Sequence, residues 1–140
     1  MPVQNKSDLE NVCREIANAF QGVLSWKWDD RFEAVLAEFG VENKDSIRAI
    51  LESYLSFVWD SPNIGNVPDS VGMINNYFGG LMSGQLLFTS DPNHDVFIFG
   101  AWWPWGNEET ISIRIGPFDK LLSESERAEL IHLFQGWFGI

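Results

Sequence analysis

Residues 101–109 form the densest group of side chains in the sequence that could hold a ligand or a partner, with three tryptophans followed by two glutamates. Trp102 and Trp103 fall in an expected strand, where successive side chains point to opposite faces. At most one of them is expected in the core, unless helices cover both faces. Trp105 follows a proline in an expected loop, and tryptophan is enriched at the centres of protein interfaces. The candidate partner-binding residues of this segment are Trp102, Trp103, Trp105, Glu108 and Glu109.

The charge of the chain indicates what kind of partner this segment would meet. The sequence has 20 acidic and 9 basic residues and a formal net charge of −11. No lysine or arginine occurs between Arg48 and Arg114, so the middle of the chain is purely acidic. We therefore add the acids of its expected turns and loops to the candidate partner-binding residues. They are Asp60, Asp69, Asp91 and Asp95.

This charge excludes some partner classes and favours another. Nucleic-acid binding relies on lysine and arginine to neutralise phosphates, and this chain has too few, so we expect no nucleic-acid partner. Anionic membrane surfaces are disfavoured for the same reason. A basic protein is favoured, because complementary charge steers the encounter and raises the association rate.

Motifs for catalysis, metals and cofactors are absent from the sequence. Cys13, His94 and His132 are the only cysteine and histidines, and their spacing matches no zinc site. Gly-x-Ser-x-Gly and phosphate-binding loops do not occur. Glycoside hydrolysis needs two carboxylates at a defined separation. Glu108 and Glu109 are adjacent on one short loop, which does not fix that separation. We expect a protein that is not an enzyme, with no cofactor and no metal.

Length and composition predict one globular domain over residues 1–140. A chain of this size can bury a sufficient core without disulfides, and 45% of its residues are hydrophobic. The N-terminus lacks the pattern of a signal peptide, and no apolar run is long enough to span a bilayer. We expect a cytoplasmic protein.

Helical spacing dominates the first half of the chain. Apolar residues recur at this spacing over 8–21, 30–39, 44–58 and 68–81, and each stretch ends near glycines or a breaker cluster. The sequence therefore predicts about four N-terminal helices.

The second half of the chain changes to alternation. Residues 85–90, 95–103 and 110–115 read as three strands of an antiparallel meander, with 95–103 central because it is apolar on both faces. Gly116 and Pro117 are expected to close the sheet. A capping box from Ser123 to Glu126 begins a C-terminal helix packed on the sheet. The predicted class is α+β.

These patterns favour a non-enzymatic acidic protein-binding module that occludes a basic partner. Bacterial immunity proteins and antitoxins, which inhibit toxic effector enzymes, are similar to this chain in size, charge and lack of catalytic motifs. That similarity is one of general character, since no motif here identifies a family. The alternatives are a cytoplasmic secretion chaperone or adaptor, and a small-molecule or carbohydrate-binding domain that uses the tryptophan-rich loop. The partner's identity and the oligomeric state stay open.

Overall fold

The structure is a computed structural model that describes residues 6–60, 63, 67–94, 96–119 and 122–140. Its helices are α1 (Lys6–Ala19), α2 (Lys44–Tyr54), α3 (Asp69–Tyr77) and α4 (Glu124–Trp137), with a short 3-10 turn, η1 (Val41–Asn43). Its strands are β1 (Lys27–Asp29), β2 (Ala34–Gly40), β3 (Phe57–Asp60), β4 (Leu86–Thr89), β5 (Val96–Pro104) and β6 (Thr110–Asp119). Within the described residues, no helix is long and apolar enough to cross a membrane.

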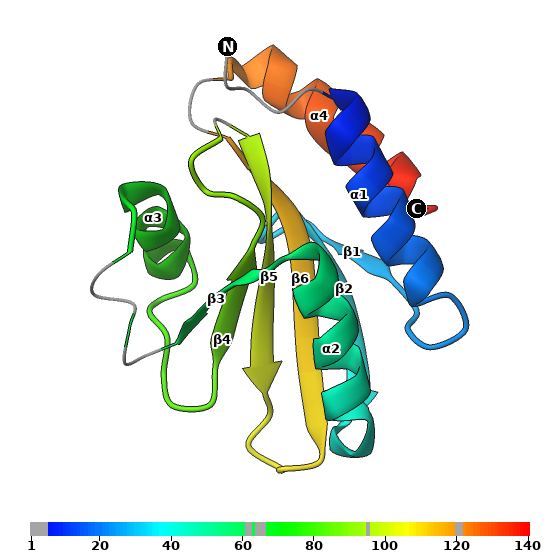
Figure 1. Cartoon of the computed structure of the whole chain (residues 1–140). Coiled ribbons are helices and arrows are strands. Elements are labelled where there is room, and N and C mark those ends of the chain that lie inside the picture. The colour runs from blue at the N-terminus through cyan, green and yellow to red at the C-terminus, as the bar shows by residue number, and fades with distance from the viewer. Residues whose placement is uncertain (1–5, 61–62, 64–66, 95, 120–121) are drawn as a thin grey trace.

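The strands form one antiparallel sheet in the order β1-β2-β6-β5-β4-β3. β5 and β6 occupy the middle of the sheet (Figure 1). Side chains of β5 alternate between two apolar clusters, with Ile98 and Trp102 in the larger cluster and Phe97 and Phe99 in the smaller. The predicted central strand, apolar on both faces, is confirmed as β5, while residue 95, its expected first residue, lies outside the described residues.

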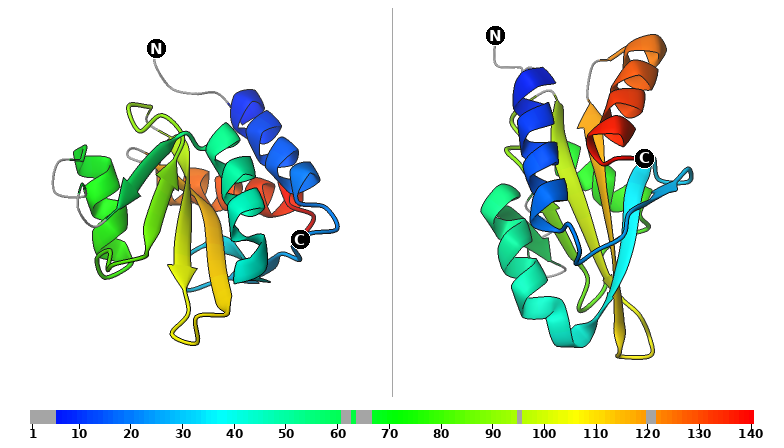
Figure 2. Two further views of the ribbon diagram at one scale, coloured as in Figure 1. Left: turned by 60° about the horizontal axis from the view of Figure 1, so that its bottom comes forward. Right: turned by 90° about the vertical axis from the view of Figure 1, so that its right-hand side faces the viewer.

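Helices cover both faces of the sheet. α1 and α2 lie on one face, α3 lies on the other, and α4 runs beside α1 near the end of β6 (Figures 1 and 2). The larger cluster joins α1, α2 and α4 to the sheet through fully buried residues such as Phe20, Leu51 and Phe134. The smaller cluster packs Val71 and Ile74 of α3 against the opposite face. Each face of β5 therefore has its own apolar layer.

The predicted architecture of about four N-terminal helices, a three-stranded meander and a C-terminal helix is wrong. The α+β class holds, and β4, β5 and β6 form the predicted meander. The sheet, however, has six strands, because β3 joins one side of the meander and β2 and β1 join the other. Among the described residues, three helices precede the meander.

The helix predicted over residues 30–39 is replaced by β2 and the turn before it. This segment satisfies helical spacing and strand alternation at once, so its own pattern does not decide between them. In the structure, Val35, Ala37 and Phe39 point into the larger cluster and lie opposite isoleucines of β6. Pairing with this β-branched row stabilises the strand, which a local pattern cannot reveal.

The helix predicted over residues 44–58 also ends early. α2 stops at Tyr54, and Phe57–Asp60 forms the edge strand β3 against β4. Val58 packs against the larger cluster and Trp59 against the smaller, so the two side chains contact opposite faces. Aromatic and β-branched residues favour strands, and here that preference prevails over the helical spacing.

β6 continues through Gly116 and Pro117 to Asp119, although this pair was expected to close the sheet. Pro117 lies opposite Ile98, whose backbone N–H and C=O bond instead to Ser90 at the end of β4. On its other side β6 pairs with β2 only as far as Ile115. A backbone N–H at residue 117 would therefore have no hydrogen-bond partner in the sheet. For this reason a proline, which lacks that N–H, is tolerated inside the strand.

α4 begins where its capping box predicts. The Ser123 side chain accepts a hydrogen bond from the Glu126 backbone N–H at 3.2 Å, and the Ser123 N–H donates to the Glu126 carboxylate at 3.0 Å. These reciprocal bonds satisfy two backbone N–H groups that a helix start would otherwise leave exposed.

An ion pair ties the outermost strand β1 to the middle of the sheet. Nε of Arg114 in β6 donates to a carboxylate oxygen of Asp29 at 2.8 Å, across the intervening β2. Burial raises the pKa of Asp29, but the hydrogen bond and charge of Arg114 outweigh it, helped by backbone N–H groups of Arg31 and Phe32. The net result is a pKa below the ordinary value.

We expect Asp29→Asn to lower the free energy of unfolding at pH 7 by about 1 to 2 kcal/mol, because the mostly buried ion pair is lost. The pKa of Asp29 is lower in the folded protein than in the unfolded chain. The stabilisation is therefore fully present above the unfolded-state pKa, about 3.9, and it is lost as the pH falls below that value. Urea unfolding of both proteins between pH 7 and pH 3 measures the difference. A gap between the two proteins that does not narrow below pH 4 would contradict the assignment.

We expect Gly116→Ala to destabilise the protein by about 1 to 3 kcal/mol, since overpacking forces neighbours to move. An added Cβ would lie 2.9 Å from a ring carbon of Phe99 and 3.0 Å from the backbone oxygen of Glu33. Gly136→Ala in α4 is the matched control, because its Cβ would meet nothing within 4 Å. Thermal unfolding should show a clear loss for the first variant and no loss for the control.

Candidate functional site

The predicted partner-binding residues separate to the two ends of the sheet. The hairpin turn with Trp105 lies at one end of β5, and the β4–β5 connection with Asp91 lies at the other (Figure 1). Nine strand residues span roughly 30 Å. Asp69 begins α3 near the Asp91 end, because the next residue, Ser70, donates to the Pro92 carbonyl at 3.4 Å. These candidates therefore do not form one patch.

Two further candidates need separate placement. Asp60 ends the edge strand β3 opposite Leu86, which itself lies opposite Trp102, so it belongs to the hairpin half of the sheet. Its backbone and side chain exchange hydrogen bonds with Asn63, at 2.8 and 3.0 Å. Asp95 lies outside the described residues.

The three tryptophans differ sharply in exposure. Trp102 is only 5% exposed and packs against Phe39 and Phe88 in the larger cluster. Trp103 points to the other face, where it is half-buried against Phe78. Trp105 is 43% exposed. Because helices cover both faces, both strand tryptophans are drawn into apolar layers, and Trp105 is left as the indole that a partner can reach.

The turn that carries Trp105 is held by its own hydrogen bonds. The Trp105 N–H donates to the Thr110 carbonyl at 2.8 Å, and the Glu108 N–H donates to the Trp105 carbonyl at 3.2 Å. The Asn107 side chain accepts from the backbone N–H groups of Glu109 and Thr110, at 2.9 and 3.1 Å. Glu108 adopts a positive φ of 61°. This ordered turn presents the exposed carboxylates of Glu108 and Glu109 beside Trp105.

Two further acids lie at the same end and were not among the predicted site residues. The Val41 N–H donates to the Glu109 carbonyl at 2.9 Å, which sets η1 and its exposed Glu42 against the turn. Glu38 in β2 is exposed and lies opposite Ser112. We call Trp105, Glu38, Glu42, Glu108 and Glu109 the acidic hairpin end.

Strand pairing places Glu38 on the same face of the sheet as Trp103. Glu38 pairs with Ser112, which pairs with Trp103, and these three side chains share the face that α3 covers elsewhere. The alternation of residues 35–39 was the available signal for Glu38, because a strand there turns its acid away from the core. The position of Glu42 depends on tertiary contact with the turn, so the sequence carried no signal for it.

A groove adjoins the acidic hairpin end on the α2 side of the sheet. It has a volume of about 430 Å³ and an apolar lining that includes Trp102, Pro104 and Ile111. Lys44 and Arg48 of α2 also line it, and Nε of Arg48 bonds to Glu52 at 3.1 Å. Asp45 completes its charged lining, and the groove meets the acidic hairpin end at Val41 and Pro104, the neighbours of Glu42 and Trp105.

The cysteine thiol, the most reactive type of side chain in the protein, is not accessible to a substrate in this structure. Cys13 is fully buried in the larger cluster, and burial raises the pKa of its thiol far above the ordinary value. A protonated, enclosed thiol is a poor nucleophile. In the described ranges, no group of three or more His, Cys, Asp or Glu side chains is placed to hold a metal ion.

We expect Asn107→Ala to loosen the turn and to cost about 1 kcal/mol of stability, because two backbone N–H groups lose their acceptor. Hydrogen exchange should accelerate at the amides of Glu109 and Thr110. Amides in the middle of β5 and β6 serve as the internal control and should change only by the global loss. Unchanged exchange at both turn amides would show that the side chain does not hold the turn.

Comparison with known proteins does not indicate a function for the chain. No model of a known protein family matches the chain, and no curated protein sequence or solved structure matches it either.

Proposed function

We propose that the protein is a non-enzymatic acidic binding module that occludes a basic protein partner through its acidic hairpin end. Within this class we favour an inhibitor of a toxic effector enzyme, as immunity proteins and antitoxins are. The observation that carries the proposal is the exposed indole of Trp105 on an ordered turn, beside Glu108 and Glu109.

The parts of this surface suit different stages of binding. Carboxylates that face solvent, in a protein of net charge −11, attract a basic partner and accelerate the encounter. A large, rigid, partly exposed indole then contributes contact area with little loss of conformational entropy, as interface tryptophans do. The hydrogen bonds of Asn107 support the proposal further, because a preformed turn loses little freedom on binding.

The burial of Trp102 favours a protein partner over a carbohydrate. A sugar site of the kind expected for the tryptophan-rich loop needs indole faces open to the ligand. Trp102 is enclosed between Phe39 and Phe88, and Trp103 is half-covered by Phe78. The remaining exposed ring suits a single anchor in a protein interface better than a stacking platform.

The proposal is tested by capturing a partner from native-host extract and measuring its binding to purified variants by surface plasmon resonance. Trp105→Ala should raise the dissociation rate about 30-fold, as expected for a hot spot worth about 2 kcal/mol. The double variant Glu108→Gln/Glu109→Gln should slow association at low salt and lose this difference at high salt. If the partner is an enzyme, stoichiometric addition of the wild-type protein should inhibit it.

A control variant removes two charges far from the turn. Asp69→Asn/Glu124→Gln changes exposed acids near the opposite end of the sheet and should leave both rate constants within about twofold. Capture of no basic protein, or equal binding by the wild type and the hairpin variants, would refute the proposal.

A further inference from the structure

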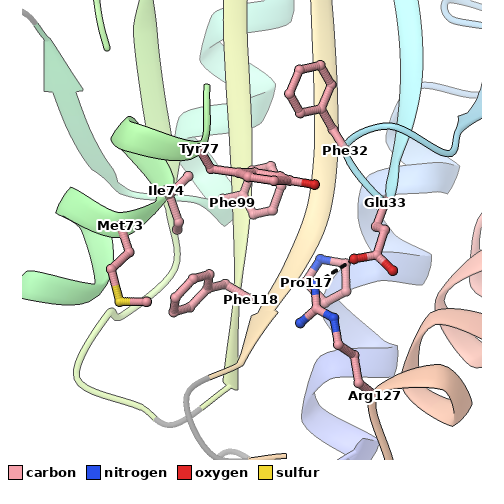
Figure 3. Close-up of a pocket in the computed structure, with 9 residues that line it drawn as sticks. All are labelled: Phe32, Glu33, Met73, Ile74, Tyr77, Phe99, Pro117, Phe118 and Arg127. Carbon is pink, nitrogen blue, oxygen red and sulfur yellow. Dashed lines mark hydrogen bonds and ion pairs between the residues drawn. The ribbon is translucent and has the colours of Figure 1, made fainter. Parts of the chain in front are cut away.

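A second concave surface lies on the α3 face of the sheet (Figure 3). Its lining residues in β6, Pro117 and Phe118, lie at the end of the strand away from the hairpin turn. Its floor is formed by Phe99, Pro117 and Phe118 of β5 and β6. One wall is Met73, Ile74 and Tyr77 of α3, and the other is Phe32, Glu33 and Arg127. We call this the α3 groove; its volume is about 240 Å³.

Direct contacts hold the walls of the α3 groove in place. The Tyr77 hydroxyl donates to the Arg31 carbonyl at 2.8 Å, and the rings of Tyr77 and Phe32 meet edge to face at 5.5 Å. Below them, Gly116 lacks the Cβ that would collide with Phe99 and with the Glu33 backbone. The cavity is therefore preformed, as small-molecule sites usually are.

The α3 groove is apolar except along one wall. There Nη2 of Arg127 donates to a carboxylate oxygen of Glu33 at 2.8 Å, and Nη1 of Arg127 bonds to Asp119. Burial would lower the pKa of Arg127, but the hydrogen bonds and charges of Glu33 and Asp119 prevail and raise it. The guanidinium is thus paired with two carboxylates. Arg127, Glu33 and Asp119 together therefore carry one negative charge in excess.

This arrangement discriminates between ligand charges. An anionic head group would meet Glu33 and a guanidinium whose fork is already occupied, so it would be repelled or would have to break an ion pair. A protonated amine would find the Glu33 carboxylate, whose side chain is 38% exposed. The guanidinium carbons of Arg31 and Arg114 lie 4.9 and 5.1 Å from the centroid of the Phe32 ring. Arg114 is paired with Asp29, and Arg31 is exposed to solvent, where water screens its charge.

We propose that the α3 groove binds a small arylalkylamine, with its ring on Phe99, Pro117 and Phe118 and its ammonium group on the Glu33 carboxylate. The volume equals that of roughly eight liquid waters at ~30 Å³ each, which suits one ring with a short chain. Met73, 61% exposed at the rim, marks the entrance. This site is separate from the acidic hairpin end and does not depend on the function proposed for it.

The test uses the full chain with isotope-labelled methionine methyl groups and two probes that differ in charge, phenethylamine and 3-phenylpropionate. NMR titration at pH 7 should show a saturable shift of the Met73 methyl with phenethylamine, and at least fivefold weaker binding of 3-phenylpropionate. Met82 is the internal control, because it is 69% exposed and does not line the groove. Equal affinity for both probes, or parallel shifts of Met73 and Met82, would overturn the proposal.

Two variants test the role of the carboxylate. Glu33→Gln keeps the side-chain size, and Glu33→Gly removes the side chain at a position whose φ of 50° suits glycine, so that folding is protected. Both should weaken phenethylamine binding at least fivefold and abolish the preference over 3-phenylpropionate. Trp105→Ala should bind phenethylamine as the wild type does. Retained amine preference in either Glu33 variant would show that the carboxylate does not select the ligand.

Discussion

The pairing of β2 with β6 brings together parts of the chain that are far apart, and both candidate sites depend on it. Ala37 lies opposite Ile113, and two residues away on either side Val35 lies opposite Ile115 and Phe39 opposite Ile111, all in the larger cluster. Closing so long a loop costs conformational entropy, which burial of this apolar row must offset. The same pairing sets Glu38 and η1 beside the hairpin turn and brings Glu33 to the α3 groove.

Coverage of both sheet faces decides which aromatic residues remain available to a partner. The larger cluster encloses Trp102, while Phe78, which directly follows α3, partly covers Trp103. Trp105 escapes both layers because it lies beyond the end of β5, in the turn. The fold thus covers the two tryptophans that lie within β5 and leaves exposed the one that lies just beyond the end of this strand.

The sequence alone was sufficient where local chemistry determined the structure. The capping box at Ser123 fixes the start of α4, and the two-sided apolar pattern of residues 95–103 identifies a central strand. It failed where two periodicities fitted the same residues, as in β2, because pairing with β6 supplied the deciding energy. It also could not locate the α3 groove, which draws its walls from the β1–β2 turn, α3, the sheet and α4.

The residues of the candidate binding surface could likewise be predicted only in part from the sequence. Trp105, Glu108 and Glu109 share one short turn, so their proximity follows directly from the chain. Charge alone groups Asp69 and Asp91 with them, and only the direction of β5 reveals that these two acids lie at the other end of the sheet. Net charge can identify a kind of partner, whereas the location of a surface requires topology.

Pro117 has a consequence for the accuracy of strand alignment. A shift of β2 by two residues along β6 would preserve its inward and outward alternation, so hydrophobicity alone would not forbid the misalignment. Such a shift in one direction would place Val35 opposite Pro117 instead of Ile115, and the ladder would lack a donor there. One imino acid beyond the paired region thus penalises a slipped register that the apolar pattern would allow.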